Sequence, residues 1–265
     1  MKYEFGFIGC GNMGGVLAEK VASAAQPFSV AVCDYFQEKA EAIREKYPVV
    51  VTTAEEIAEQ SKIVVLGVKP QAMEQTLTQI KGCLEKNEGV VLLSMAAALS
   101  IEAILNVTGK EYPMIRIMPN TPCMKGKGVL LYACRKTSEQ TENAFQTAFS
   151  NVGALYKMEE EDMDAVGALT GCGPAFAYLF AEGLAQGAAA CGVEKKQAVE
   201  YAARILIGAG EMLLGEETPE VLTKKVCSPG GTTIEGVKIL ENGAFLQDSA
   251  NAVVAAYKRT LELKK

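Results

Sequence analysis

The 265-residue chain contains no histidine and no tryptophan. The absence of histidine excludes a Ser-His-Asp or Cys-His nucleophile and any imidazole acid or base. The eight cysteines occur without CxxC spacing, and no histidine completes a zinc ligand set, so the sequence predicts no metal site. Any catalysis must therefore depend on a cofactor, on lysine, tyrosine or carboxylate groups, or on positioning of the reactants.

The chain also lacks an excess of basic residues, since its formal net charge is −6, which argues against a general nucleic-acid binder. No apolar run approaches the roughly 20 residues of a membrane span. The opening segment MKYEFGFIGCG contains a glutamate and enters a glycine loop, so it does not resemble a signal peptide. Cysteines scattered through apolar segments are typical of a reducing compartment. The sequence therefore predicts a cytoplasmic protein with neither nucleic-acid nor membrane partners.

The first half of the chain alternates between two kinds of segment. Apolar runs rich in Val, Ile and Leu occupy residues 3–8, 29–34, 62–68, 89–95, 112–118 and 128–134. Helical patterns such as EKAEAIREKY and PQAMEQTLTQI separate several of them. Strands that alternate with helices indicate βαβ units around a mostly parallel, buried sheet. We therefore expect an α/β fold, with a Rossmann-like domain over residues 1–157.

The pattern changes after Tyr156. Residues 158–265 lack convincing strands and contain three long helical segments, GPAFAYLFAEGLAQGAAACGV, EKKQAVEYAARILIGAGEMLL and AFLQDSANAVVAAYKRTLEL. The second segment is apolar around much of its circumference, which requires burial on most sides. We expect this all-helical domain to bury part of that surface in a homo-oligomer; a self-contained helical core is the alternative.

The motif GCGNMG follows a predicted strand and opens a predicted helix. In such a loop Gly9 permits the tight turn, Gly11 lets backbone amides approach a pyrophosphate, and Gly14 allows close packing of helix and strand. Asn12 and Met13 lie within the loop. The pattern predicts a dinucleotide site; a plain βαβ turn is the alternative.

Asp34 ends the second predicted strand, 20 residues after Gly14, where a ribose-binding carboxylate belongs. A carboxylate there accepts hydrogen bonds from both ribose hydroxyls of NADH and repels the 2′-phosphate of NADPH. Tyr35 and Phe36 follow Asp34, and the nearest base is Lys39 in the next helix. The sequence therefore allows NADH or NADPH and favours NADH.

Two further segments fit a dinucleotide cleft. GVKPQ places Val68, Lys69 and Pro70 directly after a predicted strand, at the edge where ligands bind in open α/β sheets. MPNTP ends another strand with Asn120 and Thr121 between two prolines. A helix-starting proline with a solvated lysine, and a plain structural turn, are the respective alternatives.

The stretch SPGGTT raises a separate question. Pro229, Gly230 and Gly231 form a turn with consecutive free N–H groups, and Thr232 or Thr233 can begin the helix TTIEGVKILE. Unpaired amides at a helix start, together with hydroxyls, make a receptor for a carboxylate. A purely structural cap is the alternative.

The segment LTKKVCSPGGTTIEGVKILE closely resembles the signature of pyrroline-5-carboxylate reductases, which catalyse the last step of proline biosynthesis. FGFIGCGNMG, VKPQ, SMAAALS, RIMPNTP and ALTGCGPAFAYLF resemble further motifs of that family, in order along nearly the whole chain. The resemblance implies a Rossmann-like domain, a helical domain that interlocks with a partner subunit, and dimers that often assemble into decamers. The implied reaction transfers a hydride from NAD(P)H to the C=N carbon of 1-pyrroline-5-carboxylate and gives L-proline.

The resemblance also implies roles for the SPGGTT turn. Ser228 and the amides of Gly230, Gly231 and Thr232 would hold the substrate carboxylate. Thr233 would face the ring nitrogen through its hydroxyl, as hydrogen-bond partner and candidate proton relay. Glu216 occupies a position where some members have an active-site carboxylate.

The resemblance implies a cofactor site made of the Gly9–Gly14 loop, Lys69, Ala97 of SMAAALS and Asn120. Asp34, Val68 and Pro70 join it from the residue pattern described above. Two departures from the family pattern stand out. The loop after Asp34 lacks the basic character of NADPH-preferring members, and Cys172 stands where many members have serine.

A site without histidine suits this chemistry, because a protonated imine carbon is already electrophilic. The protein then mainly positions the reactants, which lowers a barrier by up to about 7–11 kcal/mol. A β-hydroxyacid dehydrogenase is a rival reading, but such enzymes use a lysine in the second domain, and none occurs between Lys157 and Lys195. A nucleotide-sensing protein that kept only the fold is the second rival.

Overall fold

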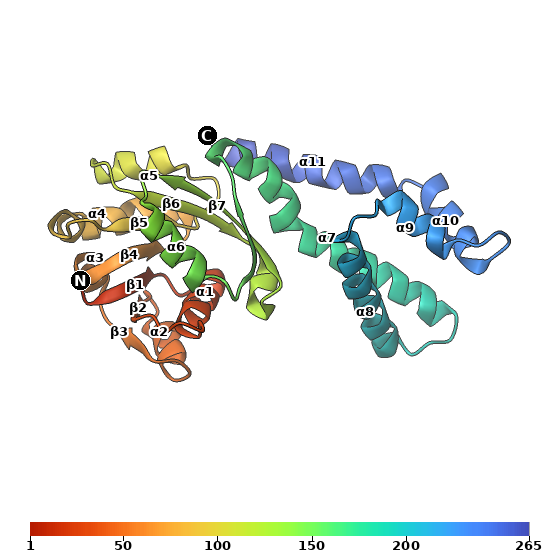
Figure 1. Ribbon diagram of the computed structural model, residues 1–265, viewed down its shortest axis with the longest axis horizontal. Helices are drawn as coiled ribbons and strands as arrows, with labels where there is room; N and C mark the ends of the chain where they lie inside the picture. The colour runs from red at the N-terminus through yellow and green to blue at the C-terminus, as the bar shows by residue number, and fades with distance from the viewer. Residues whose placement is uncertain (265) are drawn as a thin grey trace. The chain divides into compact units, whose positions relative to one another are not determined.

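Strands and helices alternate through the N-terminal part of the molecule (Figure 1). The computed structural model describes residues 1–264. In chain order the elements of this part are β1 (Tyr3–Ile8), α1 (Asn12–Ala22), β2 (Val30–Cys33), α2 (Gln37–Arg44), β3 (Val49–Val51), α3 (Ala54–Gln60), β4 (Ser61–Leu66), α4 (Pro70–Lys86), β5 (Val91–Ser94), α5 (Ile101–Thr108), β6 (Met114–Pro119), the 3₁₀ turn η1 (Thr121–Lys125), β7 (Gly128–Arg135), α6 (Glu139–Ala148), β8 (Gly153–Lys157) and the 3₁₀ turn η2 (Glu160–Asp162).

The strands form one sheet in the order β3-β2-β1-β4-β5-β6-β7-β8. Neighbouring strands pair parallel except β6 and β7, which pair antiparallel. The chain runs outward from β1 to β3 and then crosses back to place β4 beside β1. Such a reversal is the switch point at which open α/β sheets bind ligands. The predicted mostly parallel, Rossmann-like sheet is confirmed.

Helices cover both faces of this sheet, so its strands are buried on two sides. Leu17 of α1, Ile43 of α2 and Phe145 of α6 belong to one apolar cluster. Ile57 of α3 and Leu77 of α4 belong to the cluster on the opposite face. Each fully buried side chain of this size contributes about 1.5–3 kcal/mol relative to an exposed one. Burial on both faces explains why the strands read as continuous apolar runs rather than as alternating ones.

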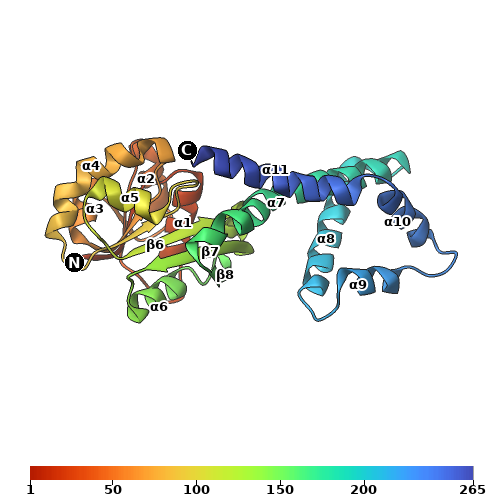
Figure 2. The same ribbon diagram turned by 90° about the horizontal axis from the view of Figure 1, so that it is seen from above.

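Helices alone make up the rest of the described chain: α7 (Met163–Ala190), α8 (Lys195–Leu213), α9 (Pro219–Val226), α10 (Thr232–Asn242) and α11 (Phe245–Leu263). The chain divides into two compact units, Met1–Gly171 with the residues from Tyr257 onward, and Cys172–Ala256. Within the second unit, α8, α9 and α10 are three distinct helices (Figure 2). None of the helices within residues 1–264 combines the length and apolar character that crossing a membrane would require.

The predicted boundary after Lys157 coincides with the end of β8, the last strand. The compact units, however, divide further on, between Gly171 and Cys172. The first turns of α7 belong to the sheet-containing unit because they pack closely on it, and a Cβ added to Gly167 would collide with the Met118 sulfur. The change of secondary structure and the change of packing therefore fall at different points.

Helix α7 is longer than predicted, because it starts at Met163 rather than at Gly173 and continues through Pro174. A proline inside a helix lacks the N–H that would pair with the carbonyl four residues earlier, here that of Thr170. The Asn120 side chain supplies the missing donor, with its Nδ2 2.9 Å from the Thr170 carbonyl oxygen. A residue far away in the sequence thus allows the helix to pass through the proline.

Candidate active site

The glycine loop between β1 and α1 has the geometry that a pyrophosphate requires. Gly9 has a φ of +103°, and a Cβ there would lie 2.6 Å from the Gly67 carbonyl carbon. A Cβ on Gly14 would collide with the Gly9 carbonyl oxygen, whereas one on Gly11 would meet no heavy atom within 4 Å. Gly11 is also the N-cap of α1, so no capping side chain occupies the first amides of this helix. The loop therefore fits the diphosphate of a dinucleotide.

The Asp34 carboxylate lies beside this loop, at the end of β2. The N–H of Cys10 donates to Asp34 Oδ2 at 2.6 Å and the N–H of Phe36 donates to Oδ1 at 2.9 Å. Lys39 Nζ lies 3.9 Å from Asp34 Oδ1 and 4.7 Å from the centre of the Phe36 ring. The backbone fixes the carboxylate in place, and each oxygen keeps a lone pair for a further donor.

Asn12, Met13, Val68, Lys69, Pro70 and Ala97 lie around the same edge of the sheet. Asn12 and Met13 begin α1. Lys69 is the exposed N-cap of α4 and Pro70 its first residue, while the backbone of Val68 abuts Gly9. Ala97 is exposed in the turn that follows β5. The carboxyl ends of parallel strands meet at one edge, so the fold brings the predicted cofactor residues together.

Asn120 has a structural function that the sequence did not reveal. Its side chain is only 7% exposed. Its Nδ2 binds the Thr170 carbonyl, and its Oδ1 accepts the N–H of Val129 at 2.9 Å. The carboxamide therefore connects the end of β6 with β7 and α7, and any cofactor contact would have to share it.

In the second unit, the residues of the SPGGTT turn stand together before α10. Gly230 has a φ of +70°, and the N–H of Gly231 donates to the Ser228 carbonyl at 3.0 Å. Gly231 is the N-cap of α10 and makes no side-chain capping bond. Thr232 is exposed and Thr233 is partly buried. Because the first amides of a helix lack intrahelical partners, this turn can receive a carboxylate.

Glu216 lies on a different segment from this turn. It occupies the exposed connection between α8 and α9, while the SPGGTT turn joins α9 and α10. Helix α9 begins at Pro219 with Thr218 as its N-cap, whose hydroxyl accepts the N–H of Val221. Glu216 and the SPGGTT turn are therefore separated along the chain by the whole of α9.

Two thiols border the cofactor edge. Burial raises the pKa of the Cys10 thiol to about 12, with a smaller contribution from Cys33 and Asp34. Burial likewise raises the pKa of Cys33 to about 12, with Asp34 again adding to it. The Cys10 thiol donates to the Cys33 carbonyl, with 3.4 Å between sulfur and oxygen. Both groups are neutral packing residues at ordinary pH, not nucleophiles.

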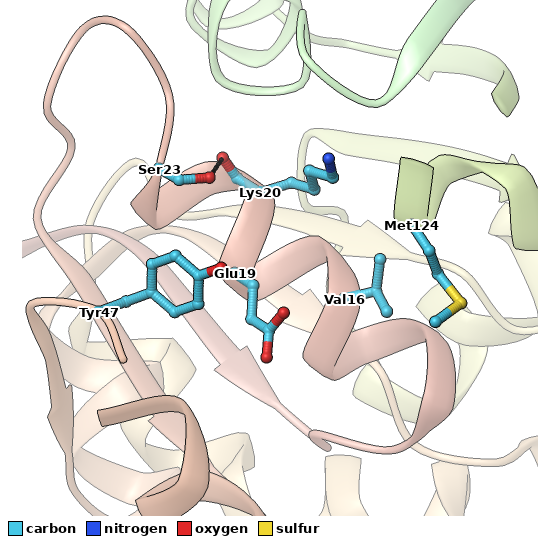
Figure 3. Close-up of a pocket in the computed structure, with 6 residues that line it drawn as sticks. All are labelled: Val16, Glu19, Lys20, Ser23, Tyr47 and Met124. Carbon is cyan, nitrogen blue, oxygen red and sulfur yellow. Dashed lines mark hydrogen bonds between the residues drawn. The ribbon is translucent and has the colours of Figure 1, made fainter. Parts of the chain in front are cut away.

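A hollow of about 140 Å³ lies beside the second half of α1 (Figure 3). It is lined by Val16, Glu19, Lys20, Ser23, Tyr47 and Met124. Its two charged side chains extend in different directions (Figure 3), and the Ser23 hydroxyl donates to the Lys20 carbonyl at 3.2 Å. The hollow is thus separate from the glycine loop and offers no converging set of polar groups.

An ion-pair network that sequence reasoning missed lies next to β6. Arg116 is 1% exposed and Asp164 is 2% exposed. Arg116 Nη2 donates to Asp164 Oδ1 at 3.0 Å and Nη1 to Glu160 Oε1 at 3.3 Å; Lys264 also pairs with Asp164. The available signal was a lone arginine inside the apolar strand RIM, which needs charged partners when buried.

Comparison with known proteins agrees with this geometry. A family model described as pyrroline-5-carboxylate reductase dimerisation matches residues 160–263. A second, described as NADP oxidoreductase coenzyme F420-dependent, matches residues 4–98. The first part of the chain is therefore an NAD(P)-binding Rossmann-like domain, and the second is a dimerisation domain.

Relatives cover almost the whole chain. Pyrroline-5-carboxylate reductase of Arabidopsis thaliana is 34% identical over 99% of this chain and 96% of its own. The enzyme of Escherichia coli is 31% identical over the full length of both. The crystal structure of Plasmodium falciparum pyrroline carboxylate reductase with NADP bound matches with a TM-score of 0.87 and 28% identity, over 99% of this chain and 98% of that one. The Coxiella burnetii structure of a pyrroline-5-carboxylate reductase covers all of both chains, with a TM-score of 0.89 and 28% identity. This chain belongs to the pyrroline-5-carboxylate reductase family.

Proposed function

We propose that the two units divide the work of one reaction, with the dinucleotide on the glycine loop and the substrate on the SPGGTT turn. Membership of the family identifies the chain as a pyrroline-5-carboxylate reductase, the NAD(P)H-dependent oxidoreductase of the last step of proline biosynthesis. The substrate assignment depends chiefly on the start of α10, where the N-cap is Gly231 and no capping side chain occupies the first amides of the helix.

In this proposal the chain binds and orients both reactants. The amides of the Gly9–Gly14 loop hold the diphosphate, and the Asp34 carboxylate accepts the ribose hydroxyls. Bound NAD(P)H supplies the hydride. Ser228 and the amides of Gly230, Gly231 and Thr232 hold the substrate carboxylate. The Thr233 hydroxyl hydrogen-bonds the ring nitrogen of the imine and relays its proton.

The proposal gives Glu216 and Asn120 lesser parts. Glu216 adds a carboxylate near the substrate through its place before α9. Asn120 supports the cofactor edge by fixing the end of β6, since its carboxamide already binds Thr170 and Val129. In this proposal neither residue positions the two carbon atoms between which the hydride moves.

We propose that NADH is the preferred cofactor. The backbone N–H groups of Cys10 and Phe36 fix the Asp34 carboxylate at the end of β2. A 2′-phosphate bound beside it would be repelled, because two negative groups at short range repel each other. Lys39 is the cation nearest to that carboxylate in the described ion pairs. Asp34→Asn should shift the ratio of kcat/KM values toward NADPH by about tenfold, which corresponds to about 1.4 kcal/mol. Lys39→Gln should shift it the other way.

The dimerisation domain makes the protein a homo-oligomer. We propose a dimer as its basic unit, with further assembly into decamers, and a division into a cofactor domain over residues 1–157 and a substrate and dimerisation domain over residues 158–265. The last strand ends at Lys157, which supports that division. Light scattering measures the mass of the assembly.

The deciding experiment mixes purified protein with 1-pyrroline-5-carboxylate and follows absorbance at the reduced nicotinamide band, with NADH and NADPH in separate reactions. Absorbance should fall as proline appears, and it should fall faster with NADH. Equal or faster turnover with NADPH would refute the cofactor preference. Tight dinucleotide binding without turnover would refute the proposed substrate site.

A further inference from the structure

Glu160 connects two parts of the molecule that lie far apart in sequence. Its Oε1 accepts the backbone N–H of Ile101 at 2.8 Å and a hydrogen bond from Arg116 Nη1 at 3.3 Å. Ile101 is the first residue of α5, and its N–H is one of those that a helix start leaves without an intrahelical partner. Glu160 therefore anchors the start of α5 from outside that helix.

Arg116 holds the Glu160 carboxylate in this position. The guanidinium is almost completely buried, and its other terminal nitrogen binds the equally buried Asp164. A buried guanidinium is rigid in orientation and strongly favours a charged acceptor. The buried guanidinium of Arg116 therefore fixes the position of the Glu160 carboxylate.

The segment that ends at Ile101 is the cofactor turn, which we define as residues 95–100. Ala98 in this turn has a φ of +63°, a conformation that costs a residue with a Cβ about 1–3 kcal/mol and persists only when the surroundings fix it. At the β5 side the buried Ser94 accepts the N–H of Ala96 at 3.2 Å. At the α5 side Ser100 accepts the N–H of Ala103, and Glu160 accepts that of Ile101. The turn is therefore fixed at both ends.

We infer that Glu160 is a positioning residue for the dinucleotide, acting through the cofactor turn. The inference depends on the proposed contact of Ala97 with the cofactor. Strand β5 lies across β1 and β4 from β2, so this turn serves the nicotinamide half of the dinucleotide, while Asp34 serves the adenosine half. Without Glu160 the turn loses its α5 anchor, and Ala97 no longer meets the nicotinamide half at a fixed place.

The experiment compares binding of NADH with binding of ADP-ribose, which lacks the nicotinamide, by fluorescence titration and competition. Glu160→Ala should weaken NADH binding about tenfold, the loss expected for one charge-assisted hydrogen bond, and leave ADP-ribose binding unchanged. Glu160→Gln, which keeps the acceptor and the size, should fall between. The matched control is Glu161→Ala, because Glu161 is the exposed neighbour in the same turn.

A general loss of structure would weaken both ligands together, so the ratio of the two dissociation constants isolates positioning from folding. An unchanged ratio in Glu160→Ala, or an equal change in Glu161→Ala, would overturn the inference. The variant Ala97→Phe tests the proposed contact between Ala97 and the cofactor separately from the role of Glu160. If Ala97→Phe leaves NADH binding unchanged, the proposed cofactor contact is wrong and the inference fails with it. If Ala97→Phe weakens NADH binding and Glu160→Ala does not, only the inference fails.

Discussion

The two compact units differ in how completely each buries its own apolar side chains. In the sheet-containing unit, two large clusters fill both faces of the sheet. In residues 172–256, all of them described, the buried apolar residues are only three alanines, Ala185, Ala198 and Ala202. Larger side chains there remain open to solvent; Leu179 is 72% exposed and Ile207 is 66% exposed.

This difference indicates that the two units become stable in different ways. The sheet-containing unit, called the cofactor unit from here on, has enough internal burial to hold the glycine loop in a fixed geometry by itself. The helical unit lacks such a core, and large exposed apolar surfaces are typical of obligate interfaces. The proposed substrate site at the SPGGTT turn therefore depends on assembly, as expected for a dimerisation domain. The prediction of a surface that needs an oligomer is consistent with these exposures, and a self-contained helical core is not.

The largest expected effect comes from placing a charge on the helical surface. Leu179→Glu in α7 and Ile207→Glu in α8 should each dissociate the oligomer, because an unpaired charge buried at an interface costs about 3–5 kcal/mol. Turnover should be lost together with assembly. Light scattering gives the mass of the assembly, and the NADH oxidation assay gives the rate.

The same change in the cofactor unit is the matched control. Val50 in β3 is 45% exposed, so Val50→Glu should leave both mass and turnover close to wild type, since surface substitutions usually stay within about 0.5 kcal/mol. Intact oligomers in both helical variants would contradict the contrast between the units.

The next effect concerns the stability of the cofactor unit. Asp164→Asn removes a charged partner of the buried Arg116. The free energy of unfolding of the cofactor unit should fall by about 3–5 kcal/mol. Asp162→Asn, on the exposed neighbouring turn, should cost less than about 0.5 kcal/mol. Circular dichroism during guanidinium titration measures both midpoints. Equal midpoints would show that the ion pair adds nothing to stability.

The thiols of the cofactor unit should be protected in the folded chain. With pKa values of about 12, Cys10 and Cys33 are thiolates in only about one molecule in ten thousand at pH 8. A cysteine in an unfolded chain has a pKa near 8.5, so alkylation should be about a thousandfold faster after unfolding. A higher pKa means less thiolate and slower reaction. Mass spectrometry after iodoacetamide treatment measures each site, and equal rates before and after unfolding would contradict the burial.

The sequence revealed the central strands and the glycine loop because both have local signals. Strands buried on two faces read as apolar runs, and the loop carries its own spacing. Strands β3 and β8, at the two edges of the sheet, were missed because they carry a weak apolar signal: β3 has only three residues, and none of the five residues of β8 is buried. Helix α9 was also missed, although Thr218 and Pro219 form a recognisable start.

Contacts between residues that lie far apart in the sequence could not be predicted from local sequence patterns. The helical segment was expected from Gly173 onward, but α7 starts earlier and runs through Pro174, where Asn120 pairs with the carbonyl that the proline leaves free. Arg116 binds Glu160 and Asp164, and nothing in a strand pattern names partners that lie in a later turn and helix. The site residues read from the glycine loop and from the SPGGTT turn remain predictions that kinetics can test.

The smallest effect separates chemistry from cofactor binding. Thr233→Ala removes the hydroxyl at the start of α10 and should lower kcat/KM for 1-pyrroline-5-carboxylate about a hundredfold, the lower range for a group that moves a proton in the transition state. Thr233→Ser keeps the hydroxyl and should retain most of the activity. The dissociation constant for NADH should be unchanged in both variants, since the cofactor unit supplies that site. Wild-type turnover in Thr233→Ala would remove Thr233 from the mechanism, and weakened NADH binding would mean that the two units do not divide the reaction as proposed.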